Sequence, residues 1–377
     1  MTALLEGLTV LDLTQLLPGP FATQLLVEMG ARVIKIEPPG VGDPTRVHPP
    51  HGPDGQGVLF AAVNRGKESV VLDLKARGAA SAFLDLARTA DVTVEGFRPG
   101  VAARLGIGPD QVRRANPRIV YVSITGYGQT GPNALRAGHD SNYQALAGTL
   151  FATGAPGGPP VLGAVQVADL AGGALSAVVA LLGALYRREK SGEGATLDIS
   201  MHDGTCALNV LSWSIWRGGG PPPGPAETVL TGLFPCYRLY RTADNRWLSV
   251  GALEPKFWLA FTEGLGAPDL GPEGFSLDPE VGRRVADLVA SRDLAHWQEV
   301  FATRDACAEP VLDVAEAAGH PHAVARGLDS PSAPPFPFLV DGLRPASTRP
   351  APALGADTER VLAEAGLSPE RIAKLRG

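Results

Sequence analysis

Two side chains that can exchange protons near neutral pH stand at the starts of apolar stretches with helix-forming composition. The glycine-rich segment 126–132 is followed by residues 133–138 and then by His139. Asp169 begins the next long apolar stretch. A histidine titrates near neutrality. A helix N-terminus favours an ionised carboxylate, whereas burial raises the pKa of that group. A histidine and a carboxylate on opposite sides of one carbon would form a two-base proton-transfer site.

Both residues also have a purely structural interpretation. His139 could be a hydrogen-bonded core histidine, and Asp169 is suitably placed to cap the helix that we expect over residues 169–189. Sequence spacing does not show whether the two side chains reach the same atom. Composition and spacing therefore leave the catalytic and the structural interpretation open for each residue.

The sequence lacks the glycine-rich motifs that bind phosphates through the backbone. No Gly-x-Gly-x-x-Gly follows the first expected strand, and there is no Gly-Lys-Ser/Thr loop. A phosphorylated ligand would therefore have to be bound by basic side chains. The candidates are Arg65, Lys67, Lys75, Arg98 and Arg104. The alternative is that these residues are ordinary solvated surface charges.

Strand-like and helix-like patterns alternate through the first two hundred residues and predict the elements that position these side chains. We expect strands at 8–13, 32–37, 69–74, 91–95, 118–124 and 195–199, and helices at 21–29, 78–89, 109–116, 169–189 and 200–217. This alternation predicts a Rossmann-like α/β domain with a mostly parallel sheet and helices on both faces. Ligands of such sheets bind beyond the carboxyl ends of the strands. The proline- and glycine-rich residues 39–58 predict a long loop between two of these elements.

The later part of the chain has a different pattern. We expect a large domain over residues 1–217, a linker over 218–234 and a small α+β domain over 235–330. The linker begins with Gly-Gly-Gly-Pro-Pro-Pro-Gly. The small domain starts with a β-hairpin, which is followed by helical segments expected over about 255–265 and 279–301. Residues 331–377 are expected to return to the large domain and to end in a helix over about 357–375.

Composition narrows the classes of function. The 377 residues are 45% hydrophobic and 19% charged, with a net charge of −6, which does not favour nucleic acid or an anionic membrane as a partner. No apolar run reaches the length of a membrane span, the first residues lack a basic signal-peptide region, and the last residues are not a peroxisomal address. We therefore expect a cytoplasmic protein. The three cysteines fit no metal-binding spacing, so no metal is expected.

Five motifs, taken in order, resemble the class III CoA-transferase (CaiB/BaiF-type) superfamily along nearly the whole chain. They are Leu-Pro-Gly-Pro at 17–20, Asn-Arg-Gly-Lys at 64–67, Phe-Arg-Pro-Gly at 97–100, Gly-Tyr-Gly-Gln-Thr-Gly-Pro at 126–132 and Ala-Asp-Leu-Ala-Gly-Gly at 168–173. Segments 138–143, 250–257 and 305–312 are most similar to the α-methylacyl-CoA racemase branch. In particular, His139 stands where the transferases usually carry an aromatic residue.

This resemblance implies an activity and roles for three residues. His139 and Asp169 would exchange the α-proton on the two faces of a 2-methylacyl-CoA thioester through an enolate-like intermediate, and Glu254 would orient His139. The site would lie between the large domain of one subunit and the small domain of the other in an interlocked homodimer. CoA would be the carrier part of the substrate, and no further cofactor would be required.

The resemblance also implies contacts to CoA. They would come from Leu72, Lys75, Arg98, Arg104 and the segment 138–143, including Gly138, Asp140 and Tyr143. The chain departs from the racemases after Glu37, where Pro38 replaces an arginine that can meet the nucleotide, so that contact would pass to Lys35 or Arg46.

Two other functions remain open at this stage. In the first, the protein moves CoA between an acyl-CoA and a carboxylic acid, with Asp169 as nucleophile. In the second, it binds CoA without catalysing a reaction. Asp169 occurs in racemases and transferases alike, whereas His139 and Glu254 favour the racemase.

Overall fold

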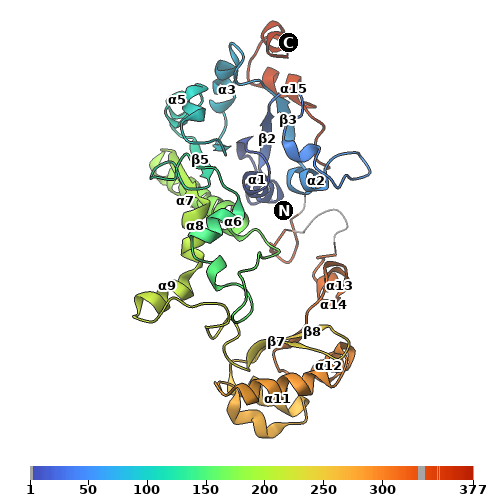
Figure 1. Ribbon diagram of the computed structural model, residues 1–377. Helices are drawn as coiled ribbons and strands as arrows, with labels where there is room; N and C mark the ends of the chain where they lie inside the picture. Colours follow the sequence, from blue (N-terminus) through green and yellow to red (C-terminus); the bar gives the residue numbers. More distant parts are fainter. Residues whose placement is uncertain (1–2, 330–335, 346, 348, 377) are drawn as a thin grey trace. The chain divides into compact units, whose positions relative to one another are not determined.

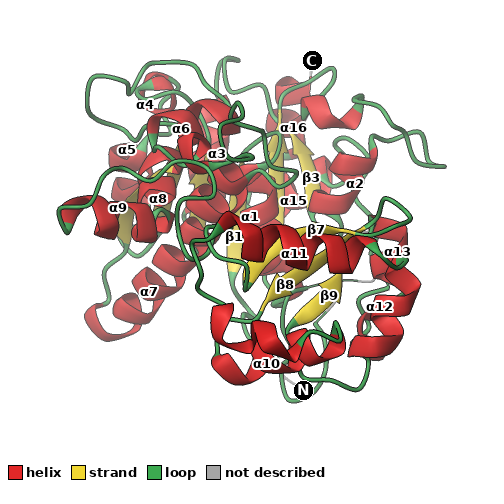
Figure 2. Ribbon diagram, turned by 60° about the horizontal axis from the view of Figure 1, so that its bottom comes forward, coloured by secondary structure: helices red, strands yellow, loops and turns green. Residues whose placement is uncertain are grey.

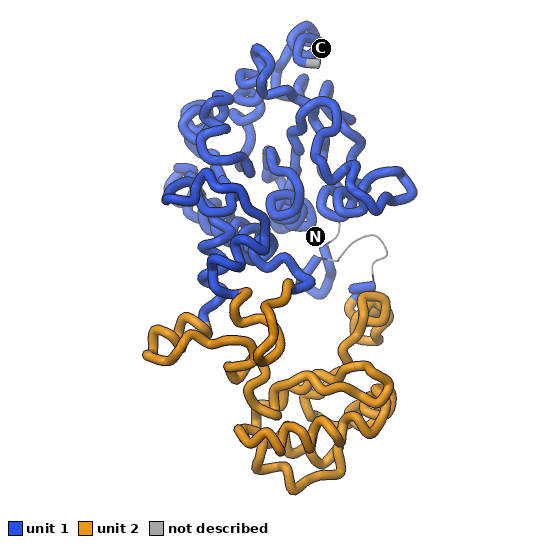
Figure 3. The backbone as a smooth tube through the Cα atoms, viewed as in Figure 1, with its two compact units in different colours: residues 1–149, 163–210, 327–377 blue, residues 150–162, 211–326 orange. Residues whose placement is uncertain are grey.

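The computed structural model describes residues 3–329, 336–345, 347 and 349–376. The chain forms two compact units, and each is described by itself (Figure 3). The first unit comprises residues 1–149, 163–210 and 327–377, and the second comprises 150–162 and 211–326. Residues 150–162 and 211–217, which we expected within the large domain, belong to the second unit.

A six-stranded parallel sheet forms the centre of the first unit, in the order β3-β2-β1-β4-β5-β6 (Figure 1). The strands are β1 (Thr9–Leu13), β2 (Arg32–Glu37), β3 (Glu68–Val71), β4 (Val92–Glu95), β5 (Val120–Thr125) and β6 (Ala195–Ser200). The expected α/β fold with a mostly parallel sheet is therefore confirmed. The strand order reverses between the neighbours β1 and β4, which is where ligands bind in folds of this kind.

Helices cover both faces of this sheet (Figure 2). They are α1 (Pro18–Glu28), η1 (Pro44–Arg46), α2 (Val58–Asn64), α3 (Ala79–Ala87), α4 (Val101–Arg104), α5 (Pro109–Ala115), α6 (Asp140–Leu146), η3 (Ala168–Leu175), α7 (Ser176–Ser191), α8 (Met201–Leu208), α15 (Thr358–Glu364) and α16 (Pro369–Arg376). Alternate strand residues enter different cores: Val10 packs in the cluster with α1 and α7, and Leu11 in the cluster with α3, α15 and α16.

Three expected helices differ in detail from those observed. The stretch expected over 169–189 begins with η3, which has π-helical hydrogen bonding, and continues as α7. The stretch expected over 200–217 is divided at Asn209 into α8 and α9 (Val210–Arg217). The terminal stretch is divided into α15 and α16 near Gly366, whose φ of +84° is incompatible with a continuous right-handed helix.

One helical stretch, Ala168–Ser191, is long and apolar enough to cross a membrane by length and composition. Half of its most apolar window is buried within the protein, where Ala177 and Leu181 join the core of the first unit. One face of this helical stretch therefore packs in the core of the first unit.

The second unit contains an antiparallel sheet in the order β7-β8-β9. Its elements are η2 (Leu150–Ala152), α9 (Val210–Arg217), whose first residue belongs to the first unit, β7 (Tyr237–Arg241), β8 (Trp247–Gly251), α10 (Pro255–Gly264), η4 (Pro268–Glu273), α11 (Pro279–Ala290), α12 (Leu294–Phe301), β9 (Ala308–Pro310), α13 (Val314–Gly319) and α14 (Pro321–Ala325). The expected hairpin corresponds to β7 and β8. The single helical segment expected over 279–301 is two helices, and β9 was not anticipated. Residues 331–335 of the expected return segment lie outside the described residues.

Candidate active site

A cleft of about 730 Å³ lies beyond the carboxyl ends of β1, β4 and β5 in the first unit. Its walls come from segments 14–19, 96–99 and 124–126, which directly follow or end these strands, and from His139 and Asp169. Because β1 and β4 are neighbours at the point where the strand order reverses, the cleft occupies the position expected for a ligand site in this fold.

His139 is the residue directly before helix α6, and its side chain is exposed in the cleft. Its backbone N–H donates to Asn142 Oδ1 at 3.0 Å, which secures the first turn of the helix. The hydroxyl of Tyr143 donates to the carbonyl oxygen of Gly138 at 2.5 Å. A Cβ at Gly138 would lie 2.8 Å from the Tyr143 ring, so glycine is required there. The backbone that carries the imidazole is thus held from two sides.

Asp169 lies in the first turn of η3 and is not the N-cap that we expected. The N-cap position is Val167, and the capping oxygen comes from Asp140, whose Oδ1 accepts the backbone N–H groups of Ala168 at 2.7 Å and Asp169 at 3.1 Å. The expected CoA contact at Asp140 is therefore a residue whose side chain links the start of α6 to the start of η3. This link brings the backbone segments that carry His139 and Asp169 together.

The carboxyl group of Asp169 titrates close to neutrality. Burial raises its pKa to about 6, the negative charge of Asp140 acts in the same direction, and His139 opposes the shift. The electrostatic influence of His139 agrees with the position of both side chains in one cleft. A carboxyl group with a pKa near 6 can either accept or deliver a proton near neutral pH.

Glu254 belongs to the second unit. It is the exposed residue directly before Pro255, which begins α10 after the β7–β8 hairpin. Its place at the start of a helix after a hairpin is the one that we expected from the sequence. Its role as a partner of His139 stays a prediction.

A smaller pocket of about 130 Å³ contains two of the residues that we expected to contact CoA, Leu72 and Lys75. Leu72 lies at its buried base, and the exposed Lys75 is part of its wall. Gln15 and Phe97 line both this pocket and the main cleft, whereas Arg98 lines the main cleft. The two pockets therefore adjoin one another along the segment after β4. Arg104 is exposed at the end of α4 and lines neither pocket.

Lys67 is placed differently from our expectation of a phosphate contact. Its side chain is fully buried, and Nζ donates to Asp12 Oδ2 at 3.0 Å, Thr23 Oγ1 at 2.7 Å and Asn64 Oδ1 at 2.9 Å. These acceptors engage all three ammonium hydrogens, so none remains for a ligand. The neighbouring Arg65 is half-buried and pairs with Glu28 at 2.7 Å, away from both pockets.

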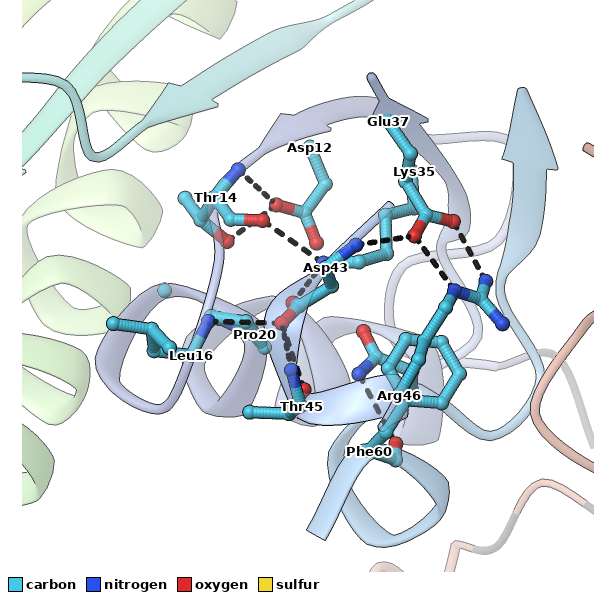
Figure 4. A network of polar contacts seen from close by, with 12 residues as sticks. Asp12, Thr14, Leu16, Pro20, Lys35, Glu37, Asp43, Thr45, Arg46 and Phe60 are labelled. Atoms are coloured by element: carbon cyan, nitrogen blue, oxygen red, sulfur yellow. Dashed lines mark hydrogen bonds and ion pairs between the residues drawn. The ribbon is translucent and has the colours of Figure 1, made fainter. Parts of the chain in front are cut away.

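The two proposed substitutes for the missing nucleotide arginine are also engaged inside the protein (Figure 4). Arg46 makes two contacts of 2.7 and 2.8 Å with the carboxylate of Glu37. Lys35 pairs with Asp43 at 3.0 Å and donates to the carbonyl oxygen of Thr14 at 2.9 Å. Neither therefore meets a nucleotide in this arrangement, and the expectation for both is corrected.

The Lys35–Asp43 pair instead shapes one wall of the cleft (Figure 4). Asp43 Oδ1 accepts the backbone N–H of Leu16 at 3.3 Å and that of Thr45 at 3.0 Å. Leu16 has a φ of +68°, a strained value for a residue with a side chain. The buried pair therefore holds two cleft-lining segments in one conformation.

The chain matches CoA-transferase family III over residues 5–358. This protein belongs to that family. Among related sequences, human α-methylacyl-CoA racemase is 36% identical over 98% of this chain and 96% of its own length. Acetyl-CoA:oxalate CoA-transferase of Acetobacter aceti is 38% identical over 86% of this chain and 84% of its own length. Family III thus includes similar relatives with both activities.

Solved structures agree with this assignment to family III. A CaiB/BaiF family protein from Brucella suis has a TM-score of 0.82 and 27% identity, covering 97% of this chain and all of its own. The protein Rv3272 of Mycobacterium tuberculosis has a TM-score of 0.81 and 29% identity over 95% of this chain and 99% of its own. The fold is therefore that of the CaiB/BaiF proteins.

Sequence reasoning overlooked several residues of the site. Gln15 and Phe97 form the boundary between the two pockets. The carboxylate of Glu95 accepts the backbone N–H of Phe97. The available signal was position alone, because each follows or ends a strand at the carboxyl edge of the sheet.

Proposed function

We propose that this family III enzyme racemises 2-methylacyl-CoA thioesters by proton transfer between two bases. The observation that carries the proposal is the presence in one cleft of an exposed histidine and a carboxyl group with a pKa of about 6. His139 would act on one face of the α-carbon and Asp169 on the other. The similarity to human α-methylacyl-CoA racemase supports the same reaction.

The thioester group determines what these residues must do. Removal of the α-proton leaves an enolate-like oxyanion, and return of a proton from the opposite face inverts the centre. Ionised Asp169 and neutral imidazole both act as bases, and their protonated forms act as acids. Proton transfer of this kind requires neither a metal nor a redox cofactor, so we propose that CoA enters only as part of the substrate.

The adjoining pockets provide a course for the CoA part. The thioester end would lie between His139 and Asp169, and the chain would pass Arg98 and Phe97 towards Leu72 and Lys75. Lys75 and Arg98 are exposed cations suited to phosphate groups.

We further propose an interlocked homodimer in which Glu254 of one chain orients His139 of the other. Exposed apolar side chains on α7 support a surface that is covered in an assembly, since Val179 is 72% and Tyr186 67% exposed. Sedimentation or native mass spectrometry would measure the oligomeric state, and a stable monomer at working concentration would contradict this part.

The alternative reaction is CoA transfer, which the 38% identity to acetyl-CoA:oxalate CoA-transferase favours. Asp169 would then attack the acyl group and form a mixed anhydride and, after it, a thioester with CoA. This reaction needs a carboxylic acid as acceptor, whereas racemisation does not.

The deciding experiment incubates one epimer of a 2-methylacyl-CoA with enzyme in deuterated water, without a carboxylic acid. We expect the α-carbon to incorporate deuterium and to lose its configuration. NMR measures the deuterium content, and chiral analysis measures the configuration. The His139→Ala variant should lose inversion. The control His51→Ala, which removes an exposed ring that hydrogen-bonds to the Val47 carbonyl oxygen, should retain inversion. Absence of exchange, together with CoA transfer once a carboxylate is added, would instead establish the transferase.

A further inference from the structure

Glu95 is a buried acid that the proton-transfer reaction does not use. It is the last residue of β4 and is only 3% exposed. Gly96, Phe97 and Arg98 follow it directly, and all three line the main cleft. Glu95 therefore lies immediately behind the wall of the site.

The side chain of Glu95 binds the backbone of that wall. Its Oε2 accepts the N–H of Phe97 at 2.6 Å, and Ser123, its neighbour in register on β5, also hydrogen-bonds to the carboxylate. The next strand repeats the arrangement, because Asp198 on β6 lies beside Ser123 and accepts the N–H of Gln129 with both oxygens. Acidic side chains at the carboxyl edge of the sheet thus secure the loops that leave it.

The environment of Glu95 is costly for a carboxylate. Burial raises its pKa to about 7 and Asp198 adds to the shift, while the hydrogen bonds from Ser123 and Phe97 oppose it. A buried acid of this kind does not stabilise a fold as efficiently as an apolar side chain of similar volume. Its hydrogen bond to Phe97 instead selects one conformation of the segment that follows.

That segment lies where the two pockets meet. Phe97 lines both the main cleft and the smaller pocket with Leu72 and Lys75, and Arg98 lines the cleft. The orientation of the Phe97 N–H determines the direction in which the chain continues, and hence where the ring and the guanidinium group lie. We refer to Phe97 and Arg98 as the CoA arm.

We propose that Glu95 is a positioning residue for CoA binding, which holds the CoA arm through the Phe97 N–H. The inference rests on the proposed course of CoA between the two pockets. It concerns the carrier part of the substrate and leaves the two bases untouched. Loss of the hydrogen bond between Glu95 and the Phe97 N–H should therefore weaken the binding of CoA itself and raise KM, with little change in kcat.

The test compares two uncharged replacements of similar size. Glu95→Leu cannot accept a hydrogen bond but fills the buried space, whereas the amide oxygen of Glu95→Gln can still accept the Phe97 N–H. Calorimetry with free CoA and steady-state kinetics on the thioester give Kd, KM and kcat. We expect Glu95→Leu to raise Kd and KM by about three- to tenfold, the range that corresponds to the loss of one typical hydrogen bond. Glu95→Gln should restore most of the affinity.

A control on the same strand separates this effect from general disturbance of the core. Thr93 lies two residues earlier on the same face of β4, and its buried hydroxyl has no hydrogen-bond partner among the described residues. Thr93→Val should therefore leave Kd, KM and kcat unchanged. The double variant with Arg98→Ala should lose less affinity than the two single variants lose when their effects are added, because part of the Glu95 effect acts through Arg98.

The outcomes distinguish this inference from the proposed function. If the wild-type protein does not bind CoA, the proposed function fails. If the wild-type protein and folded Glu95→Leu bind CoA equally well, the proposed role of Glu95 is wrong. It is also wrong if Glu95→Gln binds CoA as weakly as Glu95→Leu. Glu95→Met provides the same comparison should the leucine variant not fold.

Discussion

The side chain of Asp140 is hydrogen-bonded to the backbone of Asp169, with 3.1 Å between Asp140 Oδ1 and the Asp169 nitrogen. The same carboxylate repels the Asp169 side chain electrostatically and contributes to its raised pKa. One residue therefore both positions the proposed catalytic acid and adjusts its proton affinity. Because Asp140 directly follows His139, the two proposed bases are linked through it.

This relationship predicts a shift in the pH profile of Asp140→Asn. The amide oxygen can still accept the Asp169 N–H, but the negative charge is gone, so the pKa of Asp169 should fall below about 6. In the direction in which Asp169 removes the proton, activity depends on its ionised form and is lost as pH falls through this pKa. The acidic limb of kcat/KM against pH should therefore move to lower pH. An unchanged or raised midpoint would contradict the assignment.

The two bases should be separable by isotope exchange. His139→Asn and Asp169→Asn should each reduce racemisation by about 10²–10⁴-fold, the usual contribution of a general acid or base. Each variant retains one base. It should therefore still exchange the α-proton of one epimer, the one in which this proton faces the remaining base. Deuterium incorporation is measured separately for the two epimers. Loss of exchange from the same epimer in both variants would show that the residues do not act on opposite faces.

The proposed dimer predicts complementation between inactive chains. His139→Ala and Glu254→Ala should each be poorly active as homodimers. In a mixed dimer, one site would carry both changes and the other neither, if Glu254 acts across the interface. Co-expression with two different affinity tags isolates the mixed dimer, and we expect it to regain a site with wild-type kcat. A mixed dimer no better than its parents would show that His139 and Glu254 do not combine from different chains.

Replacement by methionine should destabilise the protein at the buried Lys67 and not at the exposed Lys75. Burial opposes ionisation of Asp12, yet the charges of Lys67 and Lys35, with hydrogen bonds from two threonines, hold its pKa below the usual range. Lys67→Met leaves this carboxylate buried with one partner fewer and should cost about 3–5 kcal/mol in the free energy of unfolding. Urea denaturation measures this quantity.

The matched control is Lys75→Met on the exposed lysine of the smaller pocket. It should change the free energy of unfolding by less than about 0.5 kcal/mol. It should nevertheless weaken CoA binding, because it removes a cation from the proposed path of the phosphates. Equal destabilisation by the two substitutions would contradict the structural role of Lys67.

Sequence patterns predicted the parallel sheet well, because a strand buried on both faces has a short apolar signature. The strand at Arg32–Glu37 has the bounds that we expected. The strand at Ala308–Pro310 was missed, since three residues carry too little pattern to identify. The π-helical start of the stretch containing Asp169 was also missed, although it contains Gly172, whose Cα lies so close to Met201 that a Cβ would be 2.7 Å from its carbonyl oxygen.

Residue type and chain position made His139 and Asp169 candidates for proton transfer, because both can titrate near neutral pH, but their proposed roles came from the family resemblance and remain a prediction. Residue type and chain position did not distinguish a buried structural lysine from an exposed lysine in a pocket. Lys67 and Lys75 are alike as residues, but Lys67 is enclosed by Asp12 and Thr23, which are far from it in the chain. Only long-range packing determines burial, and burial decides whether a charge meets a ligand or completes the interior. For the same reason, the roles of Asp140 and Glu95 became visible only in the folded chain.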